Sequence, residues 1–132
     1  MAEEAAGPPL GAREPWKAYR RRMVWQKADE LAYQVYRATR SFPGDERFGL
    51  VSQMRRASVS VAANIVEGYA HVTRKERCRF YGIARASLAE LEYYIDFVYM
   101  RLKYLDENEY EVLSPLRQDV GRLLHGFLNS EK

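Results

Sequence analysis

The sequence predicts an all-α fold, namely an antiparallel up-down-up-down four-helix bundle. Apolar residues recur at intervals of three and four in four successive stretches, which is the pattern of amphipathic helices. Short segments containing turn and helix-capping residues separate these stretches, as expected for neighbouring helices. Of the 132 residues, 47% are hydrophobic and 30% are charged, a balance typical of one folded domain. We therefore expect a single bundle in which each helix buries one face.

The expected domain organisation has three parts. Residues 1–23 are predicted to form a flexible basic N-terminal tail, because Gly and Pro are frequent up to Pro15 and basic residues follow. Residues 24–129 are predicted to form the four-helix bundle, and residues 130–132 a short C-terminal tail.

The first two helices are predicted over about residues 24–39 and 46–67. In the first, apolar side chains from Trp25 to Tyr36 follow one helical face, and Pro43 disfavours helical backbone at Phe42. In the second, the expected buried seam has steps of 4, 3, 4, 3 and 4 and consists of Leu50, Met54, Ala57, Val61, Asn64 and Gly68.

The third and fourth helices begin at capping signatures. Thr73 and Glu76 have the spacing of a capping box, and the helix that follows is predicted to run to about Tyr104, with Phe80 on its core seam. Asp106 and Glu109 repeat this signature before the fourth helix. Pro115 lies inside the fourth apolar pattern and is expected to kink or restart the helix, because proline lacks an amide hydrogen.

Several classes of protein are disfavoured by what the sequence lacks. The single Cys78 cannot form an internal disulfide, which fits a cytoplasmic protein. Neither His71 nor His125 follows a Glu by three residues, as a di-iron bundle requires, and no glycine-rich phosphate loop occurs. No window approaches 18 uninterrupted apolar residues. We expect no enzyme activity, metal, cofactor, membrane span or small-molecule substrate.

The second predicted helix carries one polar stripe at steps of 3, 4, 4 and 3. Its members are Gln53, Arg56, Ser60, Asn64 and Glu67. One interpretation is a structural network that fixes the register of the helices, because buried polar groups must be hydrogen-bonded. The alternatives are a ligand or partner site, or a catalytic cluster of Arg56, Asn64 and Glu67.

The back of the third predicted helix carries large apolar side chains outside its core seam. These residues, spaced 4, 3 and 4 apart, are Tyr93, Phe97, Met100 and Tyr104. Exposed apolar patches often mark interfaces, and Tyr and Met are enriched there. We expect this face to be covered by another subunit in a homo-oligomer.

The basic residues are clustered, although the net charge of the chain is only +3. Residues 74–85 carry a net charge of +4, and residues 106–111 carry −4. The candidate phosphate-binding residues are Lys17, Arg20, Arg21, Arg22, Arg74, Lys75, Arg77 and Arg79. The alternative is an ordinary solvated helix face.

Residues 42–68 resemble the four-helix-bundle family of ribosomal-RNA intervening-sequence proteins. The family pattern is FP-x-x-E-x-x-x-L, then Q-[LM]-R-R-A, then S-[IV]-x-x-N-I-x-E-G. The matching residues are Phe42, Pro43, Glu46, Leu50, Gln53, Arg55, Arg56, Ala57, Ser60, Asn64, Ile65, Glu67 and Gly68. Phe80 to Leu91 is similar to a second family segment, F-[LY]-x-I-A-x-[GA]-S-L-x-E-L.

The resemblance implies a homopentameric ring of four-helix bundles. A distant relative of the family, the accessory variability determinant of retroelements, is a basic pentamer that works with a reverse transcriptase and RNA. The function expected from these implications is a cytoplasmic scaffold that contacts RNA or a ribonucleoprotein through basic surfaces. The alternative is a protein-binding or accessory oligomer, for example a partner of a reverse transcriptase, with no direct role on RNA.

Overall fold

The protein is all-helical over the residues that the structure describes. The computed structural model describes residues 15–131, of which 15–20 are described by their backbone alone. Four long helices are present in this part of the chain: α2 (Pro15–Thr39), α3 (Leu50–Ala70), α4 (Arg74–Asp96) and α5 (Glu107–Ser130). A short 3-10 turn, η1 (Gly44–Glu46), precedes α3, and a π-helical segment, η2 (Phe97–Arg101), extends α4.

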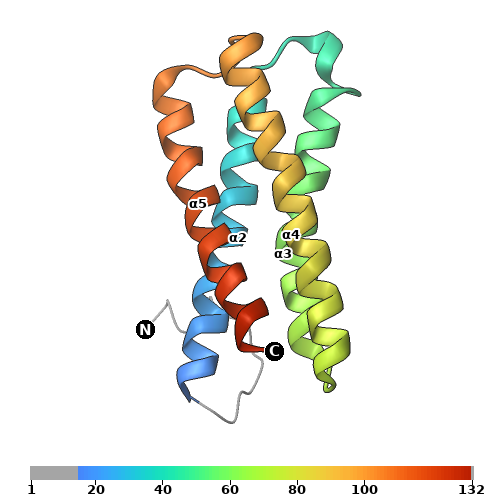
Figure 1. Ribbon diagram of the computed structural model, residues 1–132. Helices are drawn as coiled ribbons and strands as arrows, with labels where there is room; N and C mark the ends of the chain where they lie inside the picture. The colour runs from blue at the N-terminus through green and yellow to red at the C-terminus, as the bar shows by residue number, and fades with distance from the viewer. Residues whose placement is uncertain (1–14, 132) are drawn as a thin grey trace.

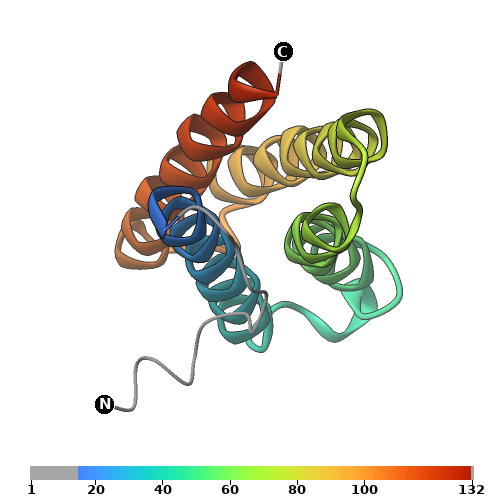
Figure 2. The ribbon, with the colours of Figure 1, turned by 90° about the horizontal axis from the view of Figure 1, so that it is seen from below.

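The four helices lie side by side around one core. The colour gradient in Figure 1 shows that successive helices are joined at the top, the bottom and then the top of the bundle. Viewed from below, in Figure 2, α2 lies between α3 and α5, and α4 completes the square. The most extensive helix pair is α3 with α4, which are joined by the short segment 71–73.

The first helix begins earlier than the sequence analysis predicted. Helix α2 starts at Pro15, so residues 15–23 of the predicted tail are helical. Pro15 occupies the first helical position, where the missing amide hydrogen costs nothing and the fixed φ angle suits the helix. The rest of the predicted tail, residues 1–14, lies outside the described residues, as does Lys132.

The core largely follows the predicted seams, with several corrections. Tyr36 of α2 is exposed, and Leu50 and Asn64 of α3 are only half-buried. Phe80 is predicted on the core seam of the third helix, but the ring that is fully buried there is its neighbour Tyr81, while Phe80 is half-buried. In α5 the buried face includes Arg117, which the sequence analysis did not place there. The largest fully buried side chains are those of Tyr81, Leu31, Met54, Ile65, Leu91, Ile95, Leu113, Leu124, Val24, Val35, Val61 and Val98.

The helix ends explain where the chain turns. The Thr73 hydroxyl accepts a hydrogen bond from the Glu76 amide at 3.3 Å. Asp106 and Glu109 form the complete predicted capping box, with bonds of 2.7 and 2.9 Å. Pro115 was expected to kink or restart the fourth helix, but α5 is one helix from Glu107 to Ser130 and does not restart at Pro115.

Helix α4 is also shorter than expected. It changes to π-helical geometry at Phe97 and ends before Lys103, whose φ of 61° is left-handed. The last turn before the α5 connection is therefore wider than an α-helical turn.

Candidate nucleic-acid interface and assembly surface

The two basic segments of the chain lie at the same end of the bundle. The N-terminus of α2, the turn 71–73 and the C-terminus of α5 all lie at the lower end in Figure 1. The Tyr69 hydroxyl donates to the Arg21 backbone carbonyl, and the Arg21 guanidinium lies 5.6 Å from the centre of the Tyr69 ring. These contacts tie the start of α2 to the end of α3, so that residues 21–22 and 74–79 share one end.

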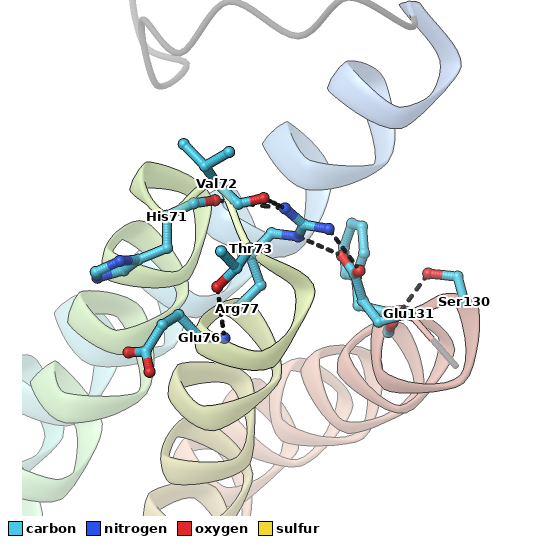
Figure 3. A network of polar contacts seen from close by, with 8 residues as sticks. His71, Val72, Thr73, Glu76, Arg77, Ser130 and Glu131 are labelled. Atoms are coloured by element: carbon cyan, nitrogen blue, oxygen red, sulfur yellow. Dashed lines mark hydrogen bonds and ion pairs between the residues drawn. The ribbon is translucent and has the colours of Figure 1, made fainter.

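Arg77 has a structural role within this end (Figure 3). Its guanidinium forms two hydrogen bonds to the Glu131 carboxylate, at 2.9 and 3.0 Å, and donates to the backbone carbonyls of His71 and Val72. The hydrogen bond to Glu131 raises the pKa of Arg77. Arg77 thus holds the α3–α4 turn against the end of α5, and its donors are directed into the protein rather than towards solvent.

The other predicted cations differ in how freely they face solvent. The side chains of Arg22, Arg74 and Lys75 are exposed. Arg79 is also exposed, although it pairs with Glu76 at 3.3 Å and lies 4.5 Å from the centre of the Phe80 ring. The side chains of Lys17 and Arg20 lie outside the described part of the structure.

Two of these cations occupy an electrostatically unfavourable position. Arg74 and Lys75 are the first two residues of α4, where the helix dipole is positive and disfavours cationic side chains. The same dipole and the free amides of a first turn favour anions such as phosphate. This end of α4 is therefore suited to binding an anionic partner.

Four of the five residues of the polar stripe of α3 form two hydrogen-bonded clusters, each of which reaches a side chain of α4. Arg56 donates to Gln53 at 2.8 Å and to Glu90 of α4 at 2.7 Å. The Ser60 and Ser87 hydroxyls are 2.7 Å apart, and the Asn64 amide donates to the Ser60 carbonyl at 2.8 Å. These contacts agree with the structural interpretation of the stripe.

The stripe is nevertheless accessible rather than sealed. Gln53, Arg56 and Glu67 are exposed, and Ser60 and Asn64 are half-buried. The hydrogen-bonded residues therefore also form part of the exposed surface of α3.

An uncharged surface flanks these hydrogen-bonded residues on both helices. On α3 it consists of Val59, Ala63 and Val66, which are exposed at helical spacing. On α4 and its π-helical extension η2 it consists of Ile83, Ala86, Tyr93, Phe97 and Met100, of which all but the half-buried Phe97 are exposed. A helix face that is directed away from the core is normally polar, so this surface has the composition of an interface.

A groove lies at the upper end of this surface, where α4 becomes π-helical. It has a volume of about 420 Å³ and is lined by Tyr93, Asp96, Phe97, Met100 and Arg101. The rings of Tyr93 and Phe97 are stacked with their centres 5.8 Å apart. Tyr93 and Met100 are 63% and 59% exposed, respectively.

Tyr104, the fourth residue predicted for the assembly surface, lies apart from the groove. Its ring packs on Phe42 with the ring centres 5.1 Å apart, and its hydroxyl donates to Glu46 at 3.0 Å. The π-helical segment and the left-handed Lys103 break the helical spacing on which its prediction depended.

An ion pair between the buried Arg117 and the partly exposed Asp96 supports the groove from the side of α5. Arg117 pairs with Asp96 at 2.9 Å and donates to the Tyr110 hydroxyl at 2.7 Å. Burial alone would lower the pKa of Arg117, but the hydrogen bond and charge of Asp96 outweigh it and raise the pKa. Arg117 lies four residues after Leu113 and three residues before Val120, both of which are buried. This helical spacing is the feature of the sequence that could have predicted its inward position.

Two tyrosines are buried near the basic end. Burial raises the pKa of Tyr81 to about 12 and raises that of Tyr69 still further. The Tyr81 hydroxyl has no hydrogen-bond partner among the described residues.

Over the residues that the structure describes, no group of three acidic, His or Cys side chains is arranged to hold a metal ion. No helix there has the length and apolar character needed to cross a bilayer.

The fold and its surfaces define a four-helix protein with one basic end and one uncharged side. Residues 20–126 match the sequence profile of the family described as 23S rRNA-intervening sequence protein. The chain belongs to this family, as the motif in residues 42–68 indicated.

The comparisons with individual proteins support the fold. The chain is similar to the crystal structure of a protein with unknown function from the S23 ribosomal protein family of Bacteroides thetaiotaomicron VPI-5482. The two are 22% identical with a TM-score of 0.75, over 83% of this chain and 98% of the other. No curated protein matches the chain.

Proposed function

We propose that this protein is a non-enzymatic, homo-oligomeric scaffold that contacts RNA or a ribonucleoprotein through its basic end. The oligomer is a pentameric ring of antiparallel four-helix bundles, as the family resemblance implies. The protein acts in the cytoplasm, where its single Cys78 stays reduced.

The position of the exposed cations at the N-terminus of α4 carries the RNA part of the proposal. Arg74 and Lys75 are exposed at the positive end of the helix dipole, where a bound anion such as a phosphate would be favoured. Arg22 and Arg79 extend the same surface. A ring would repeat this surface once per subunit, and the number of phosphates bound would increase in proportion.

The uncharged side of α3 and α4 supports the assembly part of the proposal. Val59, Val66, Ile83 and Tyr93 are exposed although they are large and apolar. Covering such a surface in a subunit interface removes apolar area from water, which favours association. Light scattering at micromolar protein concentration tests this part, and a monomer would contradict it.

The RNA part is tested by titrating a fluorescein-labelled stem-loop RNA at several salt concentrations. The wild-type protein should bind at low salt and weaken steeply as salt increases, because bound phosphates release their counterions. The double variant Arg74→Ser/Lys75→Ser should bind more weakly, with a salt slope smaller by roughly 0.7 to 0.9 for each phosphate that the variant no longer neutralises.

A variant with the same charge change at the opposite end serves as the control. Arg37→Ser/Arg40→Ser removes two exposed cations near the end of α2 and should leave RNA binding nearly unchanged. Equal weakening in the two double variants, or no binding at low salt, would contradict the proposal. Nuclease-insensitive capture of a specific protein, such as a reverse transcriptase, would favour the accessory role without direct RNA contact.

A further inference from the structure

An exposed aromatic side chain lies at the upper end of the bundle, away from the basic end and the polar stripe. Phe48, in the connection between η1 and α3, is 86% exposed. Its ring contacts the guanidinium of Arg47, which lies 5.4 Å from the ring centre. Exposing a phenylalanine to this degree gains nothing for the fold of one chain, since the side chain leaves almost no area buried.

The groove formed by Tyr93, Phe97 and Met100 lies at the same end. The connection that carries Phe48 and the π-helical end of α4 are both at the top of Figure 1. Three of the five residues that line the groove are Tyr93, Phe97 and Met100, and Phe48 is not among the lining residues. Each chain therefore presents one aromatic side chain and one aromatic groove, which do not fill each other within that chain.

The charges around the two features are complementary. Phe48 is flanked by the exposed side chains of Asp45 and Arg47. The groove is flanked by Arg101, which is exposed, and by Asp96, which keeps 42% of its side chain exposed beside its pairing with Arg117. Each side thus carries an acid and a base, and the exposed Arg101 of the groove is available to pair with the exposed Asp45 beside Phe48.

We propose that Phe48 of one copy inserts into the Tyr93–Phe97–Met100 groove of a second copy. The inference rests on the proposed assembly and names the contact that drives it. Because the two surfaces differ, the contact is heterologous: each copy uses its side chain on one neighbour and its groove on the other. Such contacts close into a ring when the rotation between neighbours permits it. The π-helical turn matters because it takes Tyr104 out of the predicted face of α4, so that Phe97 and Met100 form the groove without it.

Two single variants and a matched control test the contact. Phe48→Ser removes the inserted side chain, and Met100→Glu places a charge in the groove. Each should raise the subunit dissociation constant by about tenfold or more, as truncation of a buried interface anchor does. Val72→Ser is the control, since Val72 is 89% exposed but lies in the turn at the opposite end. The control should assemble like the wild type, and circular dichroism should show that all three variants fold.

Mixing the two variants gives the sharpest result. Phe48→Ser retains an intact groove and Met100→Glu retains an intact Phe48, so an equimolar mixture restores one contact per pair. At a protein concentration where each variant alone is monomeric, light scattering should then detect heterodimers in the mixture. An assembled wild type with both variants still assembled, or no heterodimer on mixing, would overturn this inference and leave the proposed oligomer standing. A monomeric wild type would overturn both.

Discussion

Gly68 of α3 offers a direct test of how the core is packed. A Cβ atom added to Gly68 would lie 2.4 Å from Cε1 and 2.8 Å from Cδ1 of the Tyr81 ring. Ordinary contact begins near 3.4 Å, so the ring would have to retreat by about 1 Å. Tyr81 is fully buried, with Tyr69 at 6.4 Å and Phe127 at 5.9 Å between ring centres. The ring therefore has little space into which it can move.

The expected effect of Gly68→Ala follows from two opposing terms. Replacing a helical glycine by alanine stabilises a helix by up to about 1 kcal/mol. Overpacking a filled core costs about 1 to 3 kcal/mol, and the clash here is with a rigid ring rather than a flexible chain end. We expect a net loss of about 1 to 2 kcal/mol and a decrease in Tm of roughly 3 to 8 °C.

Gly82 provides the matched control on α4. A Cβ atom at Gly82 would meet nothing within 4 Å, so Gly82→Ala should gain helix propensity and raise stability by about 0.5 to 1 kcal/mol. Urea and thermal unfolding followed by circular dichroism, at equal protein concentrations, would measure both variants. Both substitutions replace glycine by alanine in a helix, and they are expected to change the free energy of unfolding in opposite directions.

A double-mutant cycle would show whether the Tyr81 ring is the cause. Tyr81→Leu removes the atoms that clash, so Gly68→Ala should cost less in that background, with a coupling of about 1 kcal/mol or more. If Gly68→Ala is as stable as the wild type, or costs the same with Leu at position 81, the close packing of Gly68 against this ring is refuted.

Three further predictions concern ionisable groups. Burial raises the pKa of Tyr81 from 10.0 to about 12, so its contribution to stability is complete below pH 10 and is lost between pH 10 and 12. Tyr81→Phe should therefore flatten the decrease in unfolding free energy over that range by about 1.4 kcal/mol per pH unit. Arg117→Met should destabilise the bundle by about 1 to 3 kcal/mol in urea, below the cost for a fully sealed pair because the Asp96 side chain is 42% exposed. Hydrogen bonds from Lys27 and then Arg122 lower the pKa of Asp119, so its contribution is present above the ordinary carboxyl pKa and is lost as the pH falls through the lowered value. Asp119→Asn should accordingly make the unfolding free energy less dependent on pH below about pH 4. The same pH dependence in the variant and the wild type would contradict the stabilising role of the Asp119 carboxylate.

The sequence was sufficient wherever local periodicity and capping decide the structure. The three-four spacing of Met54, Ala57 and Val61 placed the buried face of α3, and Asp106 with Glu109 placed the start of α5. The motif of residues 42–68 identified the family, and the family profile matches residues 20–126.

The sequence alone could not show which predicted site residues are already engaged within the chain. Arg77 is predicted among the exposed cations, but Glu131, distant in sequence, holds its guanidinium at 2.9 Å. Tyr104 followed the spacing of an ideal helix, and the π-helical segment moved it onto Phe42. Both outcomes depend on contacts between residues far apart in the chain, which periodicity does not encode.

The sequence by itself determined that this chain is a four-helix protein of its family, because amphipathic spacing and caps act within a few residues. The tertiary structure decided which surfaces remain available. It joined the two basic segments through Tyr69 and Arg21, buried Tyr81 against Gly68, and left Phe48 exposed at the upper end of the bundle. Burial and long-range contact result from packing all four helices together, so only the folded chain distinguishes a side chain that holds the bundle from one that can meet a partner.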